Sequence, residues 1–102
     1  MTYEEAHGWA TLADPNRRSI LMKLAEGERT VSELTKALTV SQPAVSQHLK
    51  VLKLAGLVTD RAEGNKRIYR LNQAGVAALR DQLDTFWKRT MSGFEQLMEE
   101  DR

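Results

Sequence analysis

The 102-residue sequence contains no cysteine, which excludes disulfide bonds, thiolate metal ligands and a cysteine nucleophile. No stretch approaches the roughly 20 apolar residues of a membrane span, and the N-terminus lacks the basic and apolar segments of a secretory signal. A glycine-rich phosphate loop is also missing, and no serine, histidine and carboxylate occur together in an activating context. We therefore expect a cytoplasmic protein that has no membrane partner and is not an enzyme.

A further absence is local. No acidic residue occurs between Leu34 and Thr59, although the chain holds 14 aspartates and glutamates. The segment from Lys36 to Arg70 has seven basic and two acidic residues, a net charge of +5 within a chain of formal net charge +1. After Asn72, acidic residues outnumber basic ones by six to four. A basic centre with an acidic tail is typical of a protein that binds a polyanion through its middle.

Helix start signals recur through the first half of the chain. The whole chain is short enough to form one domain over residues 1–102. Asp14 precedes a proline and is expected to cap one helix. Thr30 and Glu33 have the spacing of a capping box, which predicts a second helix. Ser41 is expected to cap a third, which ends at Gly56. The helices that Thr30 and Ser41 cap flank a tight turn, which predicts a helix-turn-helix.

Beyond Gly56 the pattern changes. The runs "LVTDRAE" and "KRIYRL" flank the turn pair "GN", which predicts a β-hairpin with a basic tip. Asn72 is expected to cap a last helix over about 73–99, and Gly93 is a candidate position for a bend or for fraying. With a first helix at about 3–12, the predicted fold is mainly α with a small β-hairpin.

The helix between Ser41 and Gly56 has two distinct faces. A helical wheel places Val45, Leu49 and Leu52 on one side, as a buried face. On the opposite side lie uncharged or basic residues: Pro43, Ser46, Gln47 and Lys50. Glutamine can form a bidentate pair with adenine in the major groove, and lysine reaches phosphate oxygens or guanine. An ordinary surface helix would more often pair glutamates with lysines, so this face predicts DNA binding.

The run "LADPNRRSILMKLAEGERTVSELTKALTVSQPAVSQHLKVLKLAGLVTDRAEGNKRIYRLN" resembles the winged helix-turn-helix transcriptional regulators of the ArsR type. The resemblance implies a symmetric dimer, with the helix between Ser41 and Gly56 in the major groove and the hairpin as a wing beside it. We predict the following DNA-binding residues: Ser41, Gln42, Pro43, Ser46, Gln47, Lys50, Arg61, Lys66 and Arg67.

The helices at about 3–12 and 73–99 are expected to form the dimer interface, because the last helix carries more apolar surface than so short a chain can cover alone. An alternative is that their aromatic and methionine side chains line a ligand pocket. The predicted interface residues are Tyr3, Trp9, Leu79, Leu83, Phe86, Trp87 and Met91.

Metal sensing through the family's usual sites is not expected. Many relatives use a cysteine pair on the third helix, or aspartate, histidine and glutamate on the last helix. The helix that Thr30 caps, which is the third when the helix at about 3–12 is counted first, reads "TVSELTKAL", and the last helix contains no histidine. Of the two histidines, His48 is expected to be a packing or phosphate-adjacent residue and His7 a surface or interface residue. We therefore predict neither a metal nor another cofactor.

Taken together, these features predict a regulator that binds double-stranded DNA, acts as a dimeric repressor and recognises an inverted-repeat operator. The alternative is a winged-helix module for protein interaction or dimerisation that does not bind DNA. Such a module would favour an acidic or apolar face in place of Ser46, Gln47 and Lys50. The inducing signal stays open between a small organic molecule, a partner protein and control by abundance alone.

Overall fold

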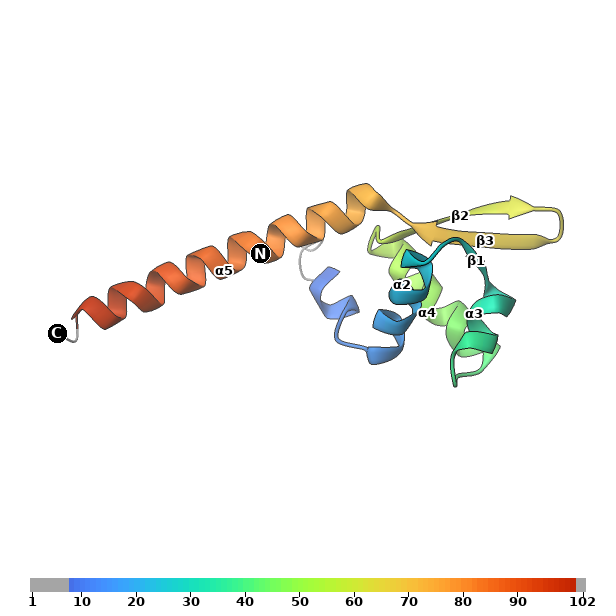
Figure 1. Ribbon diagram of the computed structural model, residues 1–102, viewed down its shortest axis with the longest axis horizontal. Helices are drawn as coiled ribbons and strands as arrows, with labels where there is room; N and C mark the ends of the chain where they lie inside the picture. The colour runs from blue at the N-terminus through green and yellow to red at the C-terminus, as the bar shows by residue number, and fades with distance from the viewer. Residues whose placement is uncertain (1–7, 101–102) are drawn as a thin grey trace.

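The computed structural model describes residues 8–100 and shows a mainly helical chain with one small sheet (Figure 1). A helical segment at residues 8–11 comes first. The elements that follow are α2 (Pro15–Ala25), β1 (Arg29–Thr30), α3 (Val31–Ala37), α4 (Gln42–Leu54), β2 (Val58–Glu63), β3 (Lys66–Leu71) and α5 (Gln73–Glu100). The predicted order of helices around a hairpin is confirmed, with one strand added.

The three predicted helix starts form as their sequences indicate. Asp14 caps α2, and its Oδ1 atom accepts a hydrogen bond of 2.8 Å from the backbone N–H of Asn16. At α3, the Glu33 N–H donates to Thr30 Oγ1, and the Thr30 N–H donates to Glu33 Oε1. Ser41 caps α4 through a bond from the Ala44 N–H. These bonds satisfy amides that have no partner inside the helix.

The sheet has three antiparallel strands in the order β1-β3-β2, so the prediction of an isolated hairpin is corrected. Arg29 pairs with Tyr69, and Thr30 pairs with Ile68. Two residues are too few to show the alternation that predicts a strand, and Thr30 carried a helix-capping signal instead. Thr30 in fact serves both elements, so the start of α3 is tied directly to the hairpin.

The hairpin turns at the predicted "GN" pair, with Glu63 opposite Lys66. Gly64 has φ +63°, whereas no residue other than glycine in the described chain has positive φ. A positive φ at only the first of the two turn residues is the pattern of a type II′ turn, which requires glycine at that position. The tip therefore presents the side chains after it, Lys66 and Arg67, at the end of the sheet.

The core lies where the helices meet the sheet. It contains apolar side chains from α2, α3, α4, the turn before β2, the start of β2 and the first turns of α5: Ile20, Leu24, Leu34, Val45, Leu49, Leu52, Leu57, Val58 and Leu79. The three core residues of α4 are those that the helical wheel selects. Burial of each such side chain contributes about 1.5–3 kcal/mol. The core thus fixes which face of α4 points outward.

Helix α5 begins in the core and then leaves it (Figure 1). It runs without interruption from Gln73 to Glu100, so the helix does not fray at Gly93, the position considered for a bend or for fraying. A glycine inside a helix weakens it by only about 1 kcal/mol and keeps its backbone hydrogen bonds. The molecule measures 65 × 25 × 24 Å, because α5 projects beyond the rest.

A close backbone contact sets the start of α5. A Cβ atom placed on Gly75 would lie 1.8 Å from the carbonyl oxygen of Gly56, in the turn after α4. The same oxygen accepts a hydrogen bond of 2.9 Å from the Asn72 side-chain amide. Asn72 immediately precedes α5, and its backbone carbonyl accepts from the Val76 N–H. The first turn of α5 therefore rests on the end of α4.

Candidate nucleic-acid interface

The outward face of α4 consists of uncharged polar and basic side chains. Val45, Leu49 and Leu52 are fully buried, whereas the residues predicted to contact DNA on this helix are exposed: Ser41, Gln42, Pro43, Ser46, Gln47 and Lys50. The core thereby holds the helix with its hydrogen-bonding side chains toward solvent. Such a face can enter a major groove without placing a carboxylate against the phosphates.

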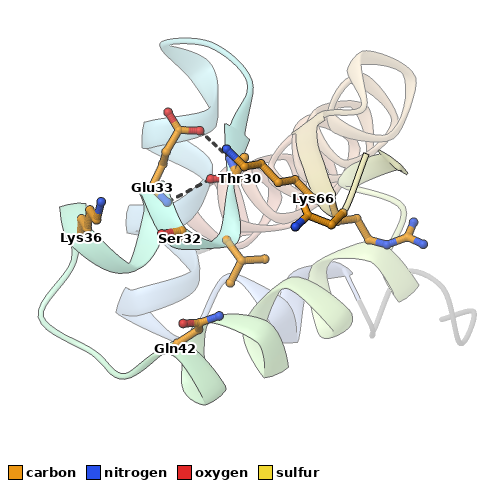
Figure 2. A pocket seen from close by; sticks show the side chains of 9 residues that line it. Thr30, Ser32, Glu33, Lys36, Gln42 and Lys66 are labelled. Atoms are coloured by element: carbon orange, nitrogen blue, oxygen red, sulfur yellow. Dashed lines mark hydrogen bonds between the residues drawn. The ribbon is translucent and has the colours of Figure 1, made fainter. Parts of the chain in front are cut away.

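A hollow of about 590 Å³ lies between α3, the first residue of α4 and the tip of the hairpin (Figure 2). Gln42 lines it and is exposed, although the helical wheel places this residue nearer the buried side. Lys36 and Lys66 add two ammonium groups to the lining. The Glu33 carboxylate, whose pKa is lowered mainly by the hydrogen bond from the Thr30 backbone, is occupied in the capping box.

The three predicted cations of the hairpin differ in their surroundings. Lys66 is exposed and forms no ion pair with any residue that the structure describes. Arg61 forms ion pairs with Glu28 and with Glu63, the latter at 3.3 Å. The guanidinium of Arg67 lies 2.9 Å from a carboxylate oxygen of Asp60. Of these three cations, Lys66 is therefore the most available to a phosphate.

Two more residues of this region escape sequence reasoning. Lys53, in the last turn of α4, lies 2.8 Å from the other carboxylate oxygen of Asp60, whose side chain is only 5% exposed. The hydrogen bond from Lys53, helped by that from Arg67, holds the pKa of Asp60 below its ordinary value of 3.8. Nothing in the sequence pattern marks this contact, because it joins two elements across the turn at Gly56.

His48 has a structural partner. The Nε–H of Arg17, in α2, donates a hydrogen bond of 3.3 Å to its Nδ1 atom. His48 is half-buried, so it links α4 to α2, which agrees with its prediction as a packing residue. His7 lies outside the described residues.

The helical segment at residues 8–11 packs on α5. The rings of Trp9 and Phe86 are 5.1 Å apart and nearly perpendicular, and Phe86 meets Trp87 in the same edge-to-face manner. Leu79 is 8% exposed and belongs to the core of this chain. Its place in the dimer interface stays a prediction, and only a small part of its side chain is exposed to a partner. Tyr3 lies outside the described residues.

Beyond Leu79, the apolar side chains of α5 are uncovered. Leu83 is half-buried, and large exposed residues follow it: Phe86, Trp87, Met91, Phe94, Leu97 and Met98. Across residues 8–100, no helix is long and apolar enough to cross a membrane. The exposed apolar residues recur at helical spacing along one side of α5, and its other positions are mostly charged or polar.

The residues of α3 and α5 do not fit the metal sites of the family that the sequence resembles. The helix α3 reads "VSELTKA" and offers one carboxylate, which its capping box already uses. The helix α5 contains no histidine. In the described part of the chain, no three histidines, aspartates or glutamates come together as a possible metal site.

Comparison with known proteins identifies the family. The family described as "Bacterial regulatory protein, arsR family" matches residues 14–60. The HTH-type transcriptional regulator Rv2034 of Mycobacterium tuberculosis is 54% identical over 91 residues, which are 89% of this chain and 85% of that protein. This chain belongs to the ArsR family. As a member, it is a DNA-binding transcriptional regulator and not an enzyme.

Solved ArsR-family structures confirm the winged helix-turn-helix fold. A crystal structure described as a possible transcriptional regulator for arsenical resistance is 42% identical, with a TM-score of 0.74 over 83% of this chain and 93% of that one. In sequence, the chain is also similar to the HTH-type transcriptional repressor SmtB of Mycobacterium tuberculosis. The two are 53% identical over 60 residues, which are 59% of this chain and 44% of that protein. The hairpin of β2 and β3 is thus the wing of this ArsR-family chain.

Proposed function

We propose that this ArsR-family protein is a homodimeric repressor that binds an inverted-repeat operator with α4 in the major groove and the hairpin beside it. The observation that carries the proposal is the two-sided burial of α4. Val45, Leu49 and Leu52 are fully buried. On the other side, Ser46, Gln47 and Lys50 are exposed without a carboxylate among them. Ser46 and Gln47 read base edges, and Lys50 and Lys66 contact phosphates.

The dimer brings two copies of α4 to one side of the duplex. The exposed apolar stripe of α5, from Leu83 to Met98, supports an interface between terminal helices. Two-fold symmetry would place the reading helices one duplex turn apart, roughly 34–36 Å. The operator is then a palindrome whose half-sites are separated by about ten base pairs or a near multiple.

Divalent metals do not control this repressor through the family's usual sites, because neither α3 nor α5 carries the ligand types for them. Zinc, copper or cadmium should therefore change operator affinity by less than about tenfold, since a site lacking thiolates and histidines binds such metals weakly.

A footprint of the purified protein on the DNA upstream of its own coding region tests the proposal. We expect protection of a palindrome, with affinity at least about 10³ times that for random duplex at the same salt concentration. Equal affinity for both DNAs would contradict the function. The same mixture, titrated with each metal at fixed ionic strength, tests metal independence, which a stoichiometric submicromolar site that changes binding would refute.

A further inference from the structure

Asp60 is the first acidic residue after the acid-free window and lies at the junction of the reading helix and the wing. Its side chain is 5% exposed, whereas those of Lys53 and Arg67 above it are 55% and 54% exposed. The carboxylate is thus covered by two cationic groups whose own outer surfaces face solvent. Neither Asp60 nor Lys53 belongs to the predicted DNA contacts.

The carboxylate of Asp60 in β2 is contacted from both α4 and β3. Lys53, from the last turn of α4, lies 2.8 Å from Oδ1, and Arg67, from β3, lies 2.9 Å from Oδ2. Asp60 itself is fixed by its place in β2, opposite Tyr69. Each carboxylate oxygen therefore holds one cation, and the pair of contacts ties the wing to the end of α4.

The small exposure of the Asp60 carboxylate restricts what its two partners can do. An ionised group with little solvent contact needs paired charges, and removing one partner is strongly unfavourable. Lys53 and Arg67 would have to weaken these contacts in order to neutralise a DNA phosphate. The lowered pKa of Asp60 agrees with this, because the charged form is stabilised mainly by Lys53.

We propose that Asp60 is a positioning residue for DNA recognition, which fixes the wing against α4 and withholds Lys53 and Arg67 from the phosphates of random DNA. Affinity that comes from phosphates is the same for every sequence, so each cation withheld weakens binding to random DNA and makes that binding less dependent on salt concentration. The inference rests on the DNA-binding function and on the proposed orientation of α4.

The first test compares Asp60→Asn with Glu63→Gln. Both substitutions remove one negative charge from β2, but Glu63 is 63% exposed, and its partner Arg61 keeps an ion pair with Glu28. With Asp60→Asn, binding to random duplex should tighten by about threefold or more, and its salt slope should steepen by up to about 1.8, or 0.9 for each released cation. Glu63→Gln should change the slope by less than half as much.

The second test remains informative if Asp60→Asn does not fold. Lys53 and Lys50 lie one turn apart on α4, and Lys50 is exposed without an ion pair to any described residue. Lys50→Gln should lower the salt slope on random DNA by about 0.9, whereas Lys53→Gln should leave it nearly unchanged. Where Asp60→Asn folds, a third arm is added: in that background, Lys53→Gln should lower the slope as Lys50→Gln does.

The outcomes separate this inference from the proposed function. Equal salt slopes for Asp60→Asn and Glu63→Gln would overturn the inference, as would equal losses for Lys53→Gln and Lys50→Gln. A wild-type protein that fails to prefer a palindrome would instead refute the proposed operator recognition, and the slopes on random DNA would still decide the role of Asp60.

Discussion

At the scale of single residues, two glycines of α5 have opposite surroundings. Gly75 faces the carbonyl of Gly56 so closely that an added methyl group would overlap it, and the Asn72 amide lies 3.3 Å from the same position. Gly93 has no atom within 4 Å of an added Cβ. The same substitution at the two sites therefore separates helix propensity from packing.

We expect Gly75→Ala to lower the free energy of unfolding and Gly93→Ala to raise it. Alanine favours a helix interior by about 1 kcal/mol over glycine, and this gain is unopposed at Gly93. At Gly75, overlap with backbone outweighs the gain, with typical overpacking losses of about 1–3 kcal/mol. Urea unfolding followed by circular dichroism measures both. A stabilised Gly75→Ala protein would show that α5 does not rest on the α4 turn as described.

At the scale of elements, α4 and the wing divide two tasks. The exposed polar residues of α4 present both donors and acceptors, which base edges require, whereas Lys66 presents only positive charge. The hollow between α3, α4 and the hairpin tip places Lys36, Gln42 and Lys66 around one space. Reading and phosphate contact are thus assigned to different elements.

Gln47→Ala should weaken operator binding by on the order of 1–3 kcal/mol and change binding to random duplex little. Lys66→Ala should weaken both and reduce the salt slope by about 0.9. Arg61→Ala serves as a control for charge, since Arg61 is held by Glu28 and Glu63, and its slope should change less. Parallel losses on both DNAs for Gln47→Ala and Lys66→Ala would contradict the division.

Features that depend on neighbours along the chain could be predicted from the sequence. The caps at Asp14, Thr30 and Ser41 are contacts over two or three residues, and the buried face of α4 follows from helical periodicity. The strand β1 was missed, because its two residues become a strand only through pairing with β3. A local pattern cannot indicate a strand of that length.

The candidate site was predicted in its composition but not in its ion pairs. All predicted residues of α4 are exposed as expected. The contacts of Asp60 with Lys53 and Arg67 join α4, β2 and β3, so they depend on how these elements pack. For the same reason, the charge pattern did not predict that Arg61 and Arg67 form ion pairs, whereas Lys66 forms none with any described residue.

At the scale of the whole molecule, α5 makes the chain longer than its size requires. The radius of gyration is 17.2 Å, whereas a compact chain of about 100 residues has roughly 13 Å. The distal half of α5 leaves large apolar side chains about half exposed, including Phe94 at 53% and Met98 at 53%. A second copy of α5 would cover them, as the proposed dimer requires.

Phe94→Glu combined with Met98→Glu should convert the dimer to a monomer, because both charges would have to be buried in the interface. The matched control is Ser92→Glu with Gln96→Glu, which adds the same charges at the same spacing on neighbouring exposed positions of α5 outside the apolar stripe. Sedimentation at micromolar concentration should show a dimer for the wild type and the control. A monomeric wild type, or a dimeric Phe94→Glu/Met98→Glu variant, would place the interface elsewhere.

The contact between Gly75 and Gly56 also has a mechanical meaning. Since α5 rests on the turn that ends α4, the contact acts as the fulcrum of a lever whose long arm is the dimerising helix and whose short arm is the reading helix. In the proposed dimer, the angle at this fulcrum sets the distance between the two reading helices. A small tilt of α5 would therefore move them out of step with the duplex repeat, and an inducer could act on the long arm without touching DNA.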